Sequence, residues 1–337
     1  MAAPVAVTPI VATPAAVTLI VPTYQRPEVV RCLDSIQQQR LEHFEVLLVD
    51  NAADDGLRSL VDGYNRRARV PVRYLAERNL GLHNARHAGV RAATGDVLVF
   101  TDDDATFDPG WLAAYAERFS RHPEMAAAGG PVRPVWETPP PGWLVDFMRG
   151  YPEMFPVLSL MEPYAEFRLS AEGWFFGVNM AIRRSLLVEL GGFNPDSFGS
   201  IWLGDGETGL NRRLWETGAL IGYVPEALVY HHVPADRMSP SYFRRRQAND
   251  GACDVYALYH RAGVPGPAGL LRQAAGVVAR SARDWLALPL VWDRTDARSL
   301  RVQMRAVRGF SQLRYLLRLL VDARLRVLVT RQNWLAA

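Results

Sequence analysis

Three adjacent aspartates, Asp102 to Asp104, are the residues of this sequence best suited to chemistry. They directly follow an apolar, β-branched run, Val97 to Thr101, which predicts a short strand buried on both faces. Burying three anions without partners is very unfavourable, so the carboxylates must lie at the end of the strand, facing solvent or a cation. Their oxygens suit Mg²⁺ or Mn²⁺, which could in turn hold a diphosphate. The alternative is a solvated turn that caps the next helix.

Two further groups of side chains that could take part in chemistry lie later in the sequence. Asp205 and Glu207 precede an amphipathic helical pattern. The positive end of the predicted helix would favour ionised carboxylates, although either acid could simply cap the helix. His231 and His232 follow residues Val224 to Tyr230, which we predict to form a strand. Strand side chains alternate, so one imidazole points inward, where its neutral form could bind a divalent ion. We favour His232 for that position.

Composition narrows the classes of protein to which the chain could belong. The chain has 337 residues, 49% of them hydrophobic, and a net charge of +3, which fits a globular protein without a nucleic-acid partner. It contains no lysine, which excludes a Walker A phosphate loop and Schiff-base chemistry, although a GC-rich genome would also favour arginine. Cys32 and Cys253 lack zinc-site spacing, and we expect thiols in a reducing cytosol.

The ends of the chain bear on its location. Residues 1–16 contain three prolines and no basic residue ahead of their apolar stretch, so we expect a flexible lead-in rather than a signal peptide. No window reaches the roughly 18 to 20 uncharged apolar residues that span a bilayer. We therefore expect a cytoplasmic protein, either soluble or peripheral at the inner face of the membrane.

Strand and helix patterns alternate in the first half. Three predicted strands, at residues 17–21, 44–49 and 72–75, precede the strand before the aspartates, and helical spacings separate them. This alternation predicts a parallel sheet with helices on both faces, in which ligands bind beyond the carboxyl ends of the strands.

Polar residues follow these strands. Pro22, Tyr24 and Arg26 come after the first strand, Asp50 and Asn51 after the second, and the aspartates after the fourth. Each set alone could be an ordinary turn. Three sets at one edge of a sheet predict a nucleotide site.

The order and spacing of these motifs resemble the nucleotide-sugar-binding half of family 2 glycosyltransferases, which have the GT-A fold. The resemblance covers about residues 17–250, and no Gly-x-Gly-x-x-Gly follows the first strand, which argues against a dinucleotide-binding dehydrogenase. It implies an α/β protein with a Rossmann-like, mostly parallel central sheet and a C-terminal helical extension. The expected parts are the lead-in 1–16, the nucleotide-sugar-binding half 17–130, the acceptor-binding and catalytic half 131–262, and the helical region 263–337.

The resemblance implies roles for the donor-site residues. Pro22, Tyr24 and Arg26 would line the base and ribose pocket, and Asp50 would accept hydrogen bonds from the base or ribose. The metal would be held by Asp104, with Asp102 and His232. The other donor-binding candidates are Asn51, Arg78, Asn79, Gly81, Arg86, Asp102, Asp103, Arg244 and Arg245. Arg86 could instead be a solvated helix-face residue, and the run at residues 242–247 could be a closing loop or a solvated basic segment.

The resemblance also implies a base and an acceptor site. Family members usually carry Glu-Asp where this chain has Gly206 and Glu207, so Glu207 falls on the base position and Asp205 is the alternative. Residues 172–184 resemble the strand beneath the acceptor. Its candidates are Trp174, Phe175, Gly177 and Asn179, although the two aromatic residues could equally belong to the core.

Beyond Pro265, helical patterns are punctuated by arginine. Leu313, Leu316, Leu317 and Leu320 form an apolar stripe among basic residues. Such a helix can lie on an anionic membrane surface, but packing on the domain is the interpretation we favour.

Together these features predict an inverting, metal-dependent glycosyltransferase. It would move a sugar from a nucleoside diphosphate sugar, with UDP-sugar favoured, to a hydroxyl of a glycan, lipid-linked or small-molecule acceptor. One alternative is a sugar-phosphate nucleotidyltransferase, but the first loop offers only Arg26 for phosphate. The other is a non-catalytic sugar- or nucleotide-binding protein, which would leave the ordered acids without a role.

Overall fold

A mixed sheet of eight strands runs through the computed structural model, which describes residues 16–25, 28–198 and 201–336. The strand order is β3-β2-β1-β4-β9-β6-β12-β8, and β3, β2, β1 and β4 are mutually parallel. The strands are β1 Val17–Thr23, β2 Glu45–Asp50, β3 Val72–Ala76, β4 Val97–Phe100, β6 Met125–Gly129, β8 Arg168–Ser170, β9 Met180–Arg183 and β12 Leu220–Tyr223.

Two strands differ from the sequence prediction. The strand within residues 172–184 is confined to β9, which runs antiparallel to β4 and to β6. The strand predicted at 224–230 is displaced, because Val224 to Ala227 form a turn between β12 and β13 Val229–Val233. β13 belongs to a second sheet, in which it lies between β5 Ala105–Phe107 and β7 Val132–Trp136. A short antiparallel pair, β10 Ser197–Phe198 and β11 Ile201–Trp202, completes the strands of the described chain.

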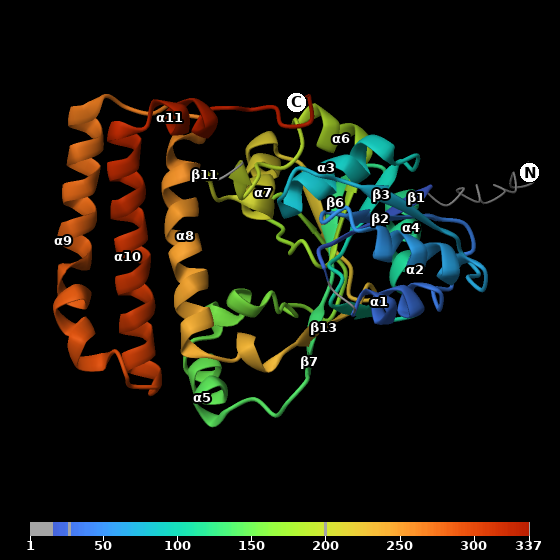
Figure 1. The fold of residues 1–337 in the computed structure, drawn as a ribbon, viewed down its shortest axis with the longest axis horizontal. Helices are drawn as coiled ribbons and strands as arrows, with labels where there is room; N and C mark the ends of the chain where they lie inside the picture. The colour runs from blue at the N-terminus through green and yellow to red at the C-terminus, as the bar shows by residue number, and fades with distance from the viewer. Residues whose placement is uncertain (1–15, 26–27, 199–200, 337) are drawn as a thin grey trace, which may run out of the picture.

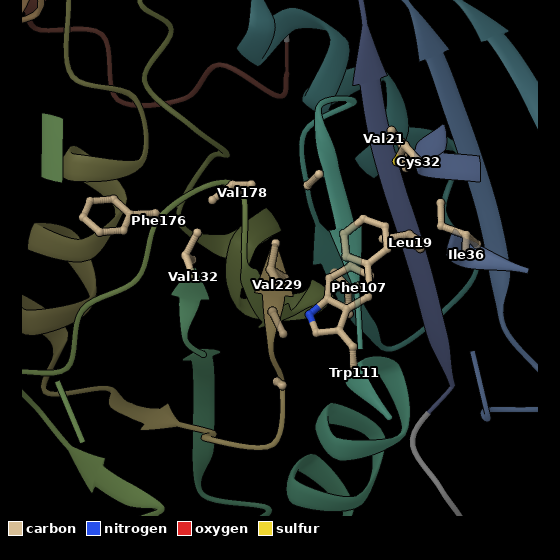
Figure 2. Packing of buried hydrophobic residues seen from close by; sticks show 14 of the residues in the cluster. Leu19, Val21, Cys32, Ile36, Phe107, Trp111, Val132, Phe176, Val178 and Val229 are labelled. Atoms are coloured by element: carbon tan, nitrogen blue, oxygen red, sulfur yellow. The ribbon is translucent and has the colours of Figure 1, made fainter. Parts of the chain in front are cut away.

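Helices cover both faces of the central sheet, as predicted. Alternate residues of β1 serve opposite faces: Leu19 and Val21 enter one core and Ile20 the other. Figure 2 shows part of the first core, where Phe107 stacks on Trp111 at 4.1 Å. The first face is covered by α1 Val29–Ile36, α2 Asp55–Asn65 and α4 Trp111–Arg121, and the second by α3 Leu82–Ala92, α6 Arg184–Glu189 and α7 Gly206–Thr217.

Long helices form a layer beside the α/β domain (Figure 1). α8 Pro240–His260 and α9 Pro267–Val291 pack on opposite sides of α10 Ala297–Val321, and α11 Ala323–Val329 follows. Of the predicted leucine stripe on α10, Leu316 is buried and Leu313 and Leu320 are partly buried, whereas Leu317 is 46% exposed. Of the remaining helices, α5 Gly142–Gly150 contacts α10, and the short helices η1 Pro152–Leu158 and η2 Ala235–Arg237 contact α8.

Candidate active site

The carboxyl ends of the parallel strands meet at one edge of the sheet. Thr23 pairs with Asp50, and Ile20 with Phe100, so the polar residues that follow these strands lie together. A cleft of about 440 Å³ opens there. Its lining includes Pro22, Thr23, Tyr24, Asn51, Leu80, Gly81, Asp102, Asp103, Asp104 and Arg237. The structure therefore brings together six of the residues predicted to bind the donor: Pro22, Tyr24, Asn51, Gly81, Asp102 and Asp103.

Asp50 and Asn51 hold the loops around the cleft. The Asp50 carboxylate is buried and accepts hydrogen bonds from the backbone of Ala52 and Asp54 and from the Tyr74 hydroxyl, at 2.7 to 2.8 Å. Asn51 accepts a hydrogen bond from Gly81 N at 2.7 Å. Asp50 therefore shapes the cleft from within and does not line it, in contrast to its predicted contact with the base or ribose.

Arg78 and Asn79 are two further predicted donor residues that do not line the cleft. Arg78 and Asn79 are exposed at the same edge, and the Asn79 carbonyl accepts a 2.8 Å hydrogen bond from Asn51 Nδ2. Arg26 falls outside the described residues.

Arg86 on α3 is the centre of the site. Its side chain is 1% exposed, which rules out the solvated helix-face alternative. One terminal nitrogen bonds Asp102 at 3.1 Å, and the other lies 3.5 Å from Glu207 on α7. A Cβ at Gly177 would lie 2.3 Å from the guanidinium, so only glycine permits this approach. The cleft and the predicted base are thus joined by one buried cation.

His83, one turn before Arg86, was not predicted as a site residue. Its ring lies 3.6 Å from Glu207 and 3.4 Å from Asp196. Burial opposes its charge, but Asp196 and Glu207 outweigh burial and raise the pKa of His83 to about 9. For Glu207, burial is likewise outweighed by the His83 hydrogen bond and the Arg86 charge, which hold its pKa far below the ordinary value. Glu207 is therefore ionised at neutral pH.

Asp205 differs from Glu207 in exposure and in orientation. It is 5% exposed, bonds Asn194 at 2.9 Å and lies against Gly209 in the first turn of α7. Burial raises the pKa of Asp205 to about 6. The Glu207 side chain keeps 26% exposure. Glu207 is thus the more accessible of the two predicted bases.

Asp103 and Asp104 point to different partners. Asp103 accepts a 2.7 Å hydrogen bond from the Thr23 hydroxyl. Asp104 accepts one from Arg237 at 2.7 Å, and its other oxygen lies 3.6 Å from His231 Nε2. Arg237 also lies 2.8 Å from that imidazole nitrogen. Sequence reasoning missed Arg237, although it follows His231 by only six residues.

The prediction for the two histidines is reversed in the structure. His231 lies beside Asp104, whereas His232 lies on the opposite side of β13 and bonds Thr106 at 3.0 Å. The alternation of strand side chains allows only one of them to face the acids. His231, and not the predicted metal ligand His232, therefore lies beside Asp104.

The side chains around Asp104 suit a divalent cation whose remaining ligands come from the substrate. Across residues 16–25, 28–198 and 201–336, no three acidic, histidine or cysteine side chains are arranged as a full ligand set. Asp104 lines the cleft, and the imidazole of His231, which is buried and does not itself line the cleft, lies 3.6 Å from the Asp104 carboxylate. Mg²⁺ and Mn²⁺ commonly take one or two protein ligands together with substrate phosphates, so these residues fit such an ion.

The predicted acceptor residues have three different environments. Phe175 and Asn179 are both fully buried, and the amide of Asn179 bonds Trp111, Tyr115 and two backbone carbonyls. Both residues are structural, which corrects their assignment to the acceptor. Gly177 contacts Arg86, as described above. Trp174 is partly exposed and lines a second cavity of about 1220 Å³, together with Trp136, Tyr164, Phe176, Arg168 and Glu172.

The predicted closing loop is part of a helix. Residues 242–247 lie in α8, where Arg244 covers the Trp292 ring at 4.0 Å and bonds Gln303. Arg245 lies over Tyr242 at 5.2 Å. Neither arginine lines the donor cleft, which corrects that prediction. Arg246 is the member of the run whose charge interacts with Glu207.

This fold and site define a glycosyltransferase of the GT-A fold. A mannosyltransferase, PcManGT from Pyrobaculum calidifontis in complex with GDP-Man and Mn²⁺, superposes with a TM-score of 0.58 at 22% identity, over 93% of this chain and 91% of that one. The chain belongs to glycosyltransferase family 2, because residues 18–191, just over half of it, match the family model for glycosyl transferase family 2.

Curated relatives agree with this assignment. The succinoglycan biosynthesis protein ExoM of Rhizobium meliloti is 28% identical over 232 residues, which are 68% of this chain and 71% of ExoM. The glucosyl-dolichyl phosphate glucuronosyltransferase of Haloferax volcanii is 27% identical over 208 residues, 59% of this chain and 62% of that protein. The match to this second relative thus spans less than two thirds of its length. The family assignment decides against the nucleotidyltransferase and the non-catalytic alternatives.

Proposed function

We propose that this chain is an inverting, metal-dependent enzyme that transfers a sugar from a UDP-sugar to an acceptor hydroxyl. The observation that carries the proposal is Arg86, which joins Asp102 beside the cleft to Glu207 on α7. A donor in the cleft and a base at Glu207 would then lie on two sides of one guanidinium. The GDP-Man and Mn²⁺ named for PcManGT support a nucleoside diphosphate sugar as the class of donor and a divalent ion as cofactor.

The cleft suits a nucleoside diphosphate. Tyr24 is 50% exposed beside Pro22 and offers a flat ring for the base, while Asn51 and the aspartates offer acceptors for its polar groups and the ribose. Arg237 lines the same cleft and is able to bond a diphosphate in place of Asp104.

Asp104 and His231 would hold a Mg²⁺ or Mn²⁺ ion, with Asp102 on the same side of the cleft. When bound, the ion would neutralise charge on the departing diphosphate. In this structure the Arg237 guanidinium bonds both proposed ligands. Binding of the ion therefore requires that Arg237 break at least one of these hydrogen bonds.

Glu207 would accept the proton of the acceptor hydroxyl. Its contacts with His83 and Arg86 keep it ionised and fix its position. The hydroxyl oxygen would form a bond to the anomeric carbon while the bond to the nucleoside diphosphate breaks. Attack from the face opposite the nucleotide inverts the configuration of that carbon.

The cavity of about 1220 Å³ is the proposed acceptor side. Phe176 lines it, and the next residue, Gly177, lies against Arg86, so this wall of the cavity adjoins the Glu207 cluster. Trp174 and the other aromatic side chains suit the faces of sugar rings as well as apolar groups. This lining supports a glycan, a lipid-linked sugar or a small natural product as acceptor.

A donor panel tests the proposal. Release of nucleoside diphosphate is measured with UDP- and GDP-sugars, with and without Mn²⁺, and the anomeric configuration of any product is read by NMR. We expect metal-stimulated release from a UDP-sugar and an inverted product. Release only from GDP-sugars would overturn the UDP assignment, full activity in chelator would overturn the metal role, and a retained configuration would overturn the mechanism.

A further inference from the structure

Among the residues that the structure describes, the outermost helix of the C-terminal layer is packed on one side only. α9 packs against α10, on the side away from α8 (Figure 1). Its buried residues, including Leu270, Ala274 and Val277, recur at helical spacing and form the side that meets α10. Most of its other residues are exposed.

The exposed side of α9 is unusually apolar. Leu271 is 54% exposed, Val278 42%, Leu286 81% and Leu290 75%. Their spacing places them along one side of the helix, about a third of a turn from the buried residues. Single exposed apolar residues are common on proteins, but a row of them along one helix marks an interaction surface.

The same surface continues onto α10. Trp285 of α9 stacks on Phe310 of α10 at 4.5 Å, which places these sides of the two helices together. Phe310, Leu317 and Val321 recur at helical spacing and are 47%, 46% and 83% exposed. We call the combined surface the outer apolar face; it consists of Leu271, Val278, Leu286, Leu290, Phe310, Leu317 and Val321.

Arginines surround this face. Residues 263–337 contain 13 arginines and 4 acidic residues, a net charge of +9, against −6 for residues 1–262. Arg272, Arg280, Arg283 and Arg314 are exposed on α9 and α10. In the described part of the chain, none of these four has a carboxylate within ion-pair distance. The helical region is therefore basic where the rest of the protein is acidic.

We infer that the outer apolar face binds an anionic membrane surface. Apolar side chains flanked by arginine on a helix lying flat match the boundary between lipid acyl chains and acidic head groups. A second copy of this chain would instead bring two strongly basic surfaces together. A nucleic acid would satisfy the charge but not the apolar row. None of the described helices is long and apolar enough to cross a bilayer, so the contact would be peripheral.

Co-sedimentation of the full-length protein with vesicles tests the inference. The vesicles are phosphatidylcholine alone, or phosphatidylcholine mixed with phosphatidylglycerol. We expect binding to the mixed vesicles that weakens as salt is raised. Two variants separate the contributions: Leu271→Ser/Leu286→Ser/Leu290→Ser removes apolar contact, and Arg272→Gln/Arg280→Gln/Arg283→Gln removes charge. Each should weaken binding by at least about tenfold.

Val188→Ser is the matched control, because Val188 is 47% exposed on α6 in the α/β domain. It should bind like the wild type, and all proteins should retain the same thermal unfolding and the same donor turnover in solution. Unchanged vesicle binding by both triple variants would overturn the inference. A wild-type protein that does not bind anionic vesicles would also overturn the inference. A dimer in solution that the leucine variant abolishes would overturn it as well, because the face would then be assigned to self-association. Donor turnover is measured separately, so failure here leaves the proposed function standing.

Discussion

Arg86 and Glu207 lie 3.5 Å apart, although 121 residues separate them in the sequence. Arg86 comes from α3, which packs on the strands that hold the donor cleft, and Glu207 opens α7 on the same face of the sheet. Asp102, the other partner of Arg86, belongs to the cleft. The two parts of the proposed reaction are therefore aligned through one buried guanidinium.

Removal of this guanidinium should cost activity. We expect Arg86→Gln to lower kcat by about 100-fold, because Glu207 and Asp102 lose the cation that positions them. The measurement is steady-state donor turnover, with circular dichroism to confirm folding. Arg91→Gln is the control, since Arg91 lies on the same helix at 46% exposure. A folded Arg86→Gln variant with normal kcat would show that the bridge is only structural.

The assignment of the base is tested by paired variants. Glu207→Gln should lower kcat by about 10³-fold while donor affinity, measured by calorimetry, changes little, because the amide cannot accept the acceptor proton. Asp205→Asn should affect the thermal unfolding temperature more than kcat, since Asp205 is buried against Asn194. A fast Glu207→Gln together with a slow Asp205→Asn would move the base to Asp205.

Metal dependence should follow Asp104 and His231. Asp104→Ala and His231→Ala should each abolish the stimulation of turnover by Mn²⁺, because each removes a proposed ligand. His232→Ala is the control, since His232 bonds Thr106 on the other side of β13. Titration of activity with Mn²⁺ in metal-free buffer gives the comparison. If the His232 variant loses the stimulation and the His231 variant keeps it, the assignment of the ligand to His231 fails.

His83 should make stability depend on pH. Its folded-state pKa, about 9, lies above the ordinary 6.5, so its contribution is fully present below pH 6.5 and is lost as the pH rises through 9. Across that range the wild type should lose stability relative to His83→Gln, on the order of 3 kcal/mol. Urea unfolding of both proteins at pH 6, 7.5 and 9 measures the difference. Parallel curves would show that His83 is not charged in the fold.

Gly177 should tolerate no side chain. Gly177→Ala would place a Cβ 2.3 Å from Arg86 Nη2, so the guanidinium has to move away from Asp102. We expect a fall in kcat similar to that of Arg86→Gln. Gly142→Ala, where no atom lies within 4 Å of the new Cβ, should be neutral. Normal turnover in Gly177→Ala would mean that the Arg86 bridge has room to shift without effect.

Local patterns in the sequence determined the α/β architecture and the donor edge. Apolar runs such as Val17–Val21 and Val97–Phe100 are followed at once by polar residues, and parallel pairing then requires those residues to share an edge. The cluster of Pro22, Tyr24, Asn51 and the aspartates could be predicted for this reason.

Long-range packing decided the rest. Whether Arg86 is solvated or buried depends on α7 and Gly177, which are remote in sequence, and which of His231 and His232 faces Asp104 depends on the register of β13. Asn179 and Phe175 are residue types suited to an acceptor site, but the segment that they belong to, which precedes β9, is buried in the core. The sequence determines the chemistry of each side chain. The solvent exposure and the partners of that side chain are determined only when segments that are distant in the chain pack together.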